Sequence, residues 1–207
     1  FAGTAETSAY RPDTAGTGRR SLRYAALSLI AAAEPARGLA LAGQELEEPD
    51  NMTAEMGALA AVLGIADAAP LRAQFLARHQ DDPLLIDKWL MLSALVPLPG
   101  AAARVEAHHT LFTWTTPNRV YALIGGLSGN LAGFHAADGE GYRVVADAII
   151  RLNDINPQVA ARMATGFRSW RQFDAPRRAA AQANMRRLLD VKALSSDAFA
   201  IITRTPA

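Results

Sequence analysis

The sequence of 207 residues contains no cysteine, which excludes disulfide bonds and thiolate metal sites and is typical of a reducing compartment. A cytoplasmic location is therefore expected. Histidine is also scarce, with four residues in the chain. They do not form the His-Glu-x-x-His pattern, in which two histidines one helical turn apart bind a catalytic zinc ion. We accordingly expect no metal site within this chain.

Strong charge and long apolar runs are absent as well. The formal net charge is +1, and 20% of the residues are charged, so the chain has no large basic surface of the kind that binds nucleic acid. No apolar run approaches the roughly 20 residues that a membrane-spanning helix needs. Neither nucleic acid nor a membrane is expected as a partner.

What the chain does contain is helical periodicity, with apolar residues recurring three and four positions apart and no convincing strand. Three helix starts share a capping residue followed by proline, namely Asp82-Pro83, Thr116-Pro117 and Asn156-Pro157. Between the prolines lie steps of 34 and 40 residues, the length of two helices with their turns. This predicts an all-α fold, an irregular superhelical array of antiparallel helix pairs like HEAT or armadillo repeats.

The boundaries follow from composition and capping residues. Residues 1–16 are rich in Thr, Ala and Gly without a helical pattern, so we expect a linker or tail from a preceding domain, followed by one helical domain over 17–207. The first helix is expected from Gly18 and the second from Leu39, after a break at Pro35 and Gly38. Asp50 or Asn51 is expected to cap the third helix, and Asp67 the fourth. Asp138 and Asp174 are expected to open two later helices.

The residues that could carry chemistry mostly favour structural roles. His108 and His109 are adjacent, so on a helix they point about 100° apart and do not readily share a metal. His135 lies near Asp138 and Glu140, where a loop histidine that bonds the next helix is favoured over a catalytic dyad. The glycines between 125 and 141 match no phosphate-binding motif. Gly125-Gly126 is expected to let a neighbouring helix approach closely.

Two arginines are placed unusually. Arg119 and Arg162 each lie in the first turns of a proline-started helix, where the positive end of the helix dipole disfavours a cation. Such an arginine either pairs with an acid or faces a ligand cavity. From the residues alone, the sequence indicates an all-α domain without a self-contained active site.

Several strings resemble the bacterial aminopeptidase N family of zinc metallo-aminopeptidases, the gluzincins. They are Asp81-Asp82-Pro83-Leu84-Leu85-Ile86-Asp87-Lys88-Trp89, Asn51-Met52-Thr53, Arg20-Ser21-Leu22, Pro117-Asn118-Arg119, the loop from Phe134 to Tyr142, and Asn156-Pro157-Gln158-Val159-Ala160 with Arg162. Their order and spacing match the family from about Gly18 to the end of the chain.

The resemblance implies that the chain is the C-terminal helical domain of a larger enzyme, which removes N-terminal amino acids from peptides. Its partners would be the upstream catalytic domain of the same polypeptide and peptide substrates. One zinc ion would be bound by that catalytic domain, and no cofactor by this chain. The domain would cap the active site and shape the cavity through which peptides enter, without being catalytic alone.

The resemblance also implies roles for particular residues. Arg162 and Gln158, four apart on one helix face, would face the cavity and bind the peptide's carboxylate and backbone. Arg119 and Tyr121 are further cavity candidates, although close relatives can carry a basic residue at position 121. Two alternatives stay open: a free-standing helical scaffold that binds a protein partner, and a small enzyme that uses the His135 loop.

Overall fold

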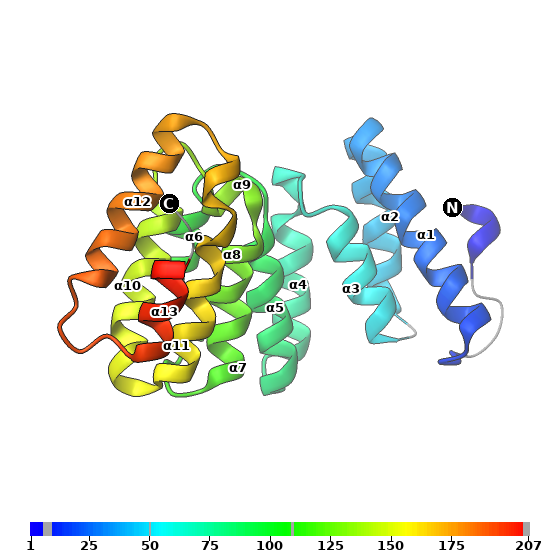
Figure 1. Ribbon diagram of the computed structural model, residues 1–207. Helices are drawn as coiled ribbons and strands as arrows, with labels where there is room; N and C mark the ends of the chain where they lie inside the picture. Colours follow the sequence, from blue (N-terminus) through cyan, green and yellow to red (C-terminus); the bar gives the residue numbers. More distant parts are fainter. Residues whose placement is uncertain (6–9, 50, 109, 205–207) are drawn as a thin grey trace. The chain divides into compact units, whose positions relative to one another are not determined.

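The computed structural model describes residues 1–5, 10–49, 51–108 and 110–204. Across these residues the chain forms α-helices and short 3₁₀ or π segments and no strand, which confirms the predicted all-α fold (Figure 1). Within the same residues, every helix is too short or too polar to cross a membrane. The chain divides into two compact units, Phe1–Asp82 and Pro83–Ala207.

The first unit is built on a helical hairpin. Its two arms, α1 and α2, are joined at Glu34 and pack closely, because a Cβ atom on Gly38 would lie 2.5 Å from the Cα atom of Ala31. Helix α3 packs against both arms. The elements of this unit are η1 (Ala2–Thr4), α1 (Thr14–Ala33), α2 (Pro35–Glu47), α3 (Met52–Ala61), η2 (Ala66–Ala68) and α4 (Ala69–His79).

Both helices of this hairpin begin earlier than predicted. Helix α1 begins at Thr14 rather than Gly18, because the side chain of Asp13 accepts a hydrogen bond from the backbone N–H of Gly16 at 2.6 Å. The helix therefore enters the segment 1–16, of which residues 6–9 lie outside the described residues. That this segment joins the chain to a preceding domain stays a prediction.

Helix α2 begins at Pro35 rather than Leu39. Proline fits the first helical position, where its missing N–H is not needed, so Pro35 starts this helix instead of marking a break. Gly38, the other expected break, lies inside α2.

Two capping predictions in this unit have different outcomes. Asn51 caps α3, since its side chain accepts a hydrogen bond from the backbone N–H of Ala54 at 3.0 Å. Its predicted alternative, Asp50, lies outside the described residues. The prediction for Asp67 is wrong, because Asp67 lies within η2, and α4 begins after Ala68 without a side-chain cap.

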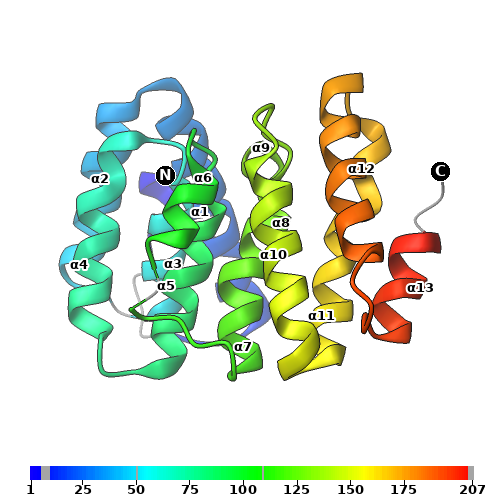
Figure 2. The same ribbon diagram turned by 90° about the vertical axis from the view of Figure 1, so that its left-hand side faces the viewer.

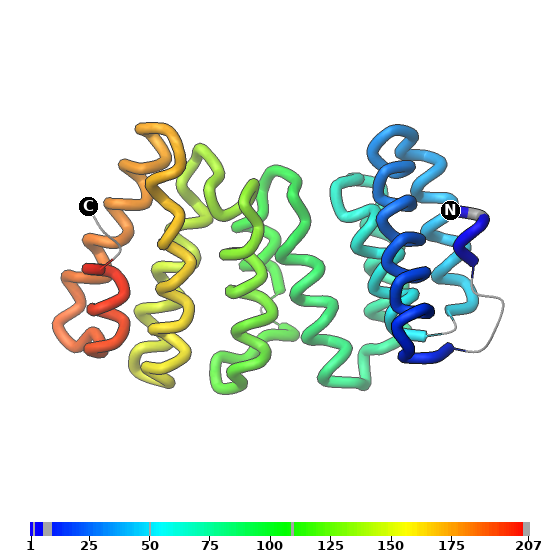
Figure 3. The backbone as a smooth tube through the Cα atoms, turned by 45° about the vertical axis from the view of Figure 1, so that its right-hand side comes forward, coloured from blue at the N-terminus to red at the C-terminus, as the bar shows by residue number. Residues whose placement is uncertain are grey.

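The second unit has two layers of helices. In one layer α5 packs against η3 and α8, η3 packs against α11, and α11 packs against α13. In the other layer α10 packs against α6 on one side and α12 on the other (Figures 2 and 3). The elements are α5 (Pro83–Leu95), α6 (Ala101–Glu106), α7 (Pro117–Val120), η3 (Tyr121–Gly125), α8 (Gly126–Gly129), α9 (Leu131–Phe134), α10 (Glu140–Ile155), α11 (Pro157–Ala164), η4 (Thr165–Gln172), α12 (Ala175–Leu189) and α13 (Ser196–Arg204).

Two of the predicted helix starts in this unit are closed by side-chain caps. Asn156 accepts a hydrogen bond from the N–H of Val159 at 3.2 Å, and Asp174 accepts one from Arg177 at 3.0 Å. Thr116 makes no such bond, so its predicted cap is wrong even though α7 does begin at Pro117.

The start of α10 differs slightly from its prediction. This helix begins at Glu140, and its capping position is Gly139, in the left-handed region with φ of 74°. Asp138 lies just before it and accepts a hydrogen bond from the N–H of Glu140 at 3.0 Å.

The core of the second unit contains an aromatic cluster. Phe134, Tyr142 and Phe167 are fully buried, with ring centres 5.0 to 6.0 Å apart. Gly141 makes this packing possible, because it brings the first turn of α10 directly onto the backbone of α9. The predicted close approach at Gly125-Gly126 applies to the second glycine, where a Cβ atom on Gly126 would lie 2.9 Å from the Cβ atom of Ala94.

Candidate functional site

Arg162 and Tyr121 lie against each other in the second unit. The guanidinium carbon of Arg162 is 4.8 Å from the centre of the Tyr121 ring, a cation–π separation. Arg162 is exposed on α11, and Gln158 is exposed one turn earlier on the same helix. Met163 and other residues on the opposite side of α11 are buried. The structure thus brings together two of the predicted site residues and leaves Gln158 open to solvent beside them.

Tyr121 owes its position to an irregular helix. The single turn of α7 runs into η3, a π-helix that begins at Tyr121 and ends at Gly125, before α8 resumes α-helical geometry. A π turn holds one more residue than an α turn, and such turns are rare and frequently found at functional sites. Nothing in the sequence predicts it.

Arg119, the remaining predicted site residue, is engaged within the unit. Its side chain is 11% exposed and forms an ion pair with Asp87 of α5. It also donates hydrogen bonds to the carbonyl oxygens of Leu111 and of Pro83, the latter at 3.3 Å. Of the two alternatives for this arginine, the structure therefore provides the acid partner. A role for Arg119 at a ligand cavity stays a prediction.

His135 is buried among polar and aromatic side chains in the core. Its Nδ1 atom lies 2.7 Å from the hydroxyl of Tyr142, and its Nε2 atom lies 3.2 Å from that of Ser169. The ring stacks on Phe173 at 3.7 Å, and Arg177 donates a hydrogen bond to its carbonyl oxygen. These contacts place His135 in the structural role that the sequence favoured.

The surroundings of His135 disfavour its charged form. Burial, and secondarily the positive charge of Arg177, lowers the pKa of His135 from its ordinary 6.5 to about 4. Burial also raises the pKa of the neighbouring Tyr142 hydroxyl to about 12. Both groups are therefore neutral at pH 7.

This lowered pKa predicts a pH-dependent stability. Between pH 6.5 and 4 the unfolded chain binds a proton at His135 that the folded chain does not. The free energy of unfolding is therefore independent of this histidine above pH 6.5 and falls below it, by up to about 1.4 kcal/mol per pH unit. We expect His135→Gln to lose less stability than the wild type between pH 7 and pH 5. Denaturant titrations followed by tryptophan fluorescence measure this loss in the second unit, which holds all three tryptophans. Equal losses in both proteins would contradict the prediction.

His79 and His108, the other two histidines that the structure describes, lie against acidic or aromatic side chains. His108 lies edge-on to Trp89 at 4.6 Å, and His109 lies outside the described residues. His79 forms a 2.8 Å contact with Glu55 in the first unit. Among residues 1–5, 10–49, 51–108 and 110–204, no group of three histidine, aspartate or glutamate side chains could bind a metal ion.

The second unit also holds a cavity of about 540 Å³ that the sequence did not reveal. The cavity lies beside the short helix α6 and the segment that connects α6 to α7. The floor is apolar, and two aromatic residues and three charged residues complete the lining. The lining residues are Val105, Glu106, Phe112, Trp114, Leu123, Ile124, Val144, Asp147, Ala148 and Arg151.

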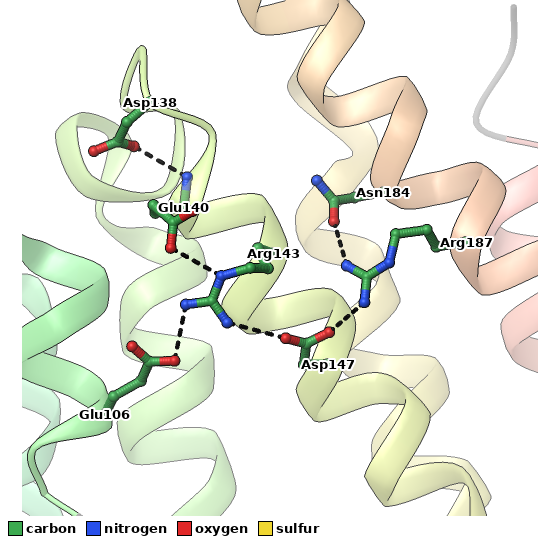
Figure 4. A network of polar contacts seen from close by, with 7 residues as sticks. All are labelled: Glu106, Asp138, Glu140, Arg143, Asp147, Asn184 and Arg187. Carbon is green, nitrogen blue, oxygen red and sulfur yellow. Dashed lines mark hydrogen bonds and ion pairs between the residues drawn. The ribbon is translucent and has the colours of Figure 1, made fainter.

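The two acids of the cavity belong to a charge network centred on Arg143 (Figure 4). Arg143 binds Glu106 at 2.9 Å, Glu140 at 2.8 Å and Asp147 at 3.1 Å. Asp147 is also bound by Arg187 at 2.6 Å. Hydrogen bonds with Glu106 and then Glu140 raise the pKa of Arg143 above its ordinary value. Both cavity acids are thus neutralised by arginines and tie α6, α10 and α12 together.

Arg151 is the remaining charged residue of the cavity, and it has a different partner. Its guanidinium carbon lies 4.6 Å from the centre of the Trp114 ring. Trp114 in turn packs edge-on against Phe112 at 4.7 Å. Within the part of the chain that the structure describes, Arg151 pairs with no acid. The only sequence signal for this feature is the short Phe112-Thr113-Trp114 segment, which has no helical period.

Comparison with known proteins places the whole chain in one family. Residues 1–207 match the family model DUF3458_C, a domain of unknown function with ARM repeats. This match confirms the armadillo-like array that the spacing of the helix starts predicted. It also covers both compact units of the chain.

Individual relatives are larger proteins. The chain is 33% identical over 207 residues to aminopeptidase N of Escherichia coli K12, covering 97% of this chain and 24% of that protein. Aminopeptidase N of Haemophilus influenzae is 37% identical over 157 residues, covering 72% and 18%. A crystal structure of Legionella pneumophila aminopeptidase A in complex with aspartic acid superimposes with a TM-score of 0.85 at 27% identity, covering 97% and 25%. The matched part of the chain thus spans 18% to 25% of the length of these relatives.

Proposed function

We propose that this chain, which belongs to the DUF3458_C family of ARM-repeat domains, is the C-terminal helical domain of a cytoplasmic zinc-dependent aminopeptidase N. In this role it caps the catalytic domain of the same polypeptide and shapes the cavity through which peptides reach the active site. The similarity to aminopeptidase N over 97% of the chain is the observation that carries the proposal.

The chemistry of bond cleavage would lie outside this chain. Its described residues offer no set of three ligands for zinc, so they do not fit a zinc site. The zinc ion and the groups that act on the peptide bond would therefore belong to the catalytic domain. This domain would contribute to binding and orienting the peptide.

Arg162 is the residue that we propose contacts the substrate. Its guanidinium is exposed, lies over the Tyr121 ring and pairs with no acid among the described residues. An arginine in this state keeps its N–H donors available for a carboxylate or a carbonyl oxygen. Gln158, one turn earlier, would bond the peptide backbone. Tyr121 would hold the guanidinium in place through its ring.

This role predicts a substrate-dependent loss of activity. In the intact enzyme, Arg162→Ala is expected to lower kcat/KM for tripeptides by roughly ten- to a hundredfold, because a charged hydrogen bond is lost. Single aminoacyl anilides lack residues beyond the cleaved bond, so their kcat/KM is expected to stay near the wild-type value. Steady-state kinetics with both substrates measure the difference.

Arg168 provides the matched control for this experiment. It is another exposed arginine, on η4, and Arg168→Ala is expected to leave both substrates unaffected. If Arg162→Ala lowered activity on peptides and anilides equally, the proposed contact with the substrate residues beyond the cleaved bond would be wrong.

A further inference from the structure

We propose that the cavity of the second unit is a binding site for a small organic carboxylate with an apolar body, and that Arg151 binds its carboxylate. The site is separate from the proposed substrate-facing residues, since its lining includes neither Arg162 nor Gln158 nor Tyr121. The inference therefore does not depend on the proposed function.

The size and the floor of the cavity favour a compact apolar group. Its volume of about 540 Å³ lies within the roughly 300–1,000 Å³ of small-molecule sites. The floor is made by side chains of α6, η3 and α10, among them Leu123, Ile124 and Val144, which are all buried. Phe112 and Trp114, both half-buried, complete it with aromatic surface. An aromatic or aliphatic ligand body would bury apolar surface against these side chains, which is favourable in water.

The charges at the cavity favour an anion over a cation. Glu106 and Asp147 are each held by arginine, at 2.9 Å for Glu106 and at 2.6 and 3.1 Å for Asp147. A cationic ligand would have to compete with these arginines for the same carboxylates. Arg151 has no such partner within the described residues, so its charge and its N–H donors remain available.

The contact with Trp114 prepares Arg151 for this task. An exposed arginine usually samples many rotamers and loses this freedom when it binds. Stacking on the indole ring at 4.6 Å restricts the guanidinium while leaving its edge free to donate. The planar edge of a guanidinium can donate two parallel hydrogen bonds to a carboxylate, and the apolar floor favours a carboxylate that carries an apolar body.

The test uses 4-phenylbutanoate as the probe and the full 207-residue chain. Calorimetric titration is expected to show one binding site in the wild type. Arg151→Gln is expected to raise the dissociation constant about tenfold or more. The neutral 4-phenylbutanamide and the cationic 4-phenylbutylamine are both expected to bind the wild type more weakly than the carboxylate. In NMR spectra of protein labelled at the indole nitrogens, the Trp114 signal is expected to shift at the lowest probe concentrations.

Arg186→Gln is the matched control, since Arg186 is an exposed arginine of α12 that does not line the cavity. It is expected to bind the probe like the wild type. Arg151 is exposed, so both variants should keep the melting temperature of the wild type. The proposal is overturned if the carboxylate does not bind, if Arg151→Gln binds it as well as the wild type does, or if the amide or amine binds as tightly.

Discussion

Gly141→Ala is expected to lower the free energy of unfolding of the second unit by about 3 kcal/mol or more, because the added methyl group meets only backbone. A Cβ atom on Gly141 would lie 2.5 Å from the carbonyl oxygens of Gly133 and Phe134, and 2.6 Å from the Cα atom of Phe134. No side chain can turn away to relieve these contacts. Helix α10 would have to move off α9, and the aromatic cluster around Tyr142 would open.

Tryptophan fluorescence in a denaturant titration measures this loss, since Trp89, Trp114 and Trp170 all lie in the second unit. Gly129→Ala provides the control. A Cβ atom on Gly129 would meet nothing closer than a side-chain carbon of Leu95 at 3.8 Å, which is ordinary contact. Its stability should be unchanged or slightly increased, because alanine reduces the freedom of the unfolded chain. Similar stabilities for the two variants would show that α10 can shift without cost.

Asn130→Asp is expected to cost about 3–5 kcal/mol at pH 7, since it would bury a negative charge against two carbonyl oxygens. Asn130 is 3% exposed and donates hydrogen bonds to the carbonyl oxygens of Ala94 at 2.9 Å and Val96 at 2.8 Å. It also accepts one from the N–H of Gly133 at 3.0 Å. The Asn130 side-chain amide thus satisfies backbone groups both at residues 94–96 and in α9. A carboxylate in its place would lose both donors and face two carbonyl oxygens.

The control for this variant is Asn118→Asp, in the exposed first turn of α7, where a negative charge is favoured by the helix dipole. Thermal unfolding at pH 7 should separate the two variants clearly. Because a buried carboxyl group protonates more readily than an exposed one, the deficit of Asn130→Asp relative to the wild type should shrink as the pH falls towards 4. A full deficit at low pH would assign the loss to geometry rather than charge.

The helical fold could be predicted from the sequence because its signals are local. The apolar period marks one face of each helix, and Asn156 and Asp174 cap the helices that follow them. That Gln158 and Arg162 share one face of α11 also follows from their spacing of four residues. Predicted helix boundaries are wrong where one residue type is found both within helices and at their ends. The predicted break at Pro35 is wrong, because proline at the first position starts a helix.

The candidate sites could be predicted less well, because they depend on contacts between distant segments. Asp87 pairs with Arg119 across 32 positions, and nothing near either residue indicates the other. The cavity combines α6, the connection after it, η3 and α10, so no continuous motif encodes it. The partner of Arg162 was also hidden, since Tyr121 reaches it through an irregular turn.

That irregular turn has an evolutionary consequence. A π turn is equivalent to an α-helix that has gained one residue, and the wider turn absorbs this residue locally. Loss of a single codon between Tyr121 and Gly125 would restore a regular helix and leave the segments before and after it in the same relative orientation. Gly126 would keep its place beside Ala94, but the turn that begins at Tyr121, beside Arg162, would become narrower. The length of this helical segment, as well as the two side chains, thus determines how the aromatic ring and the arginine meet.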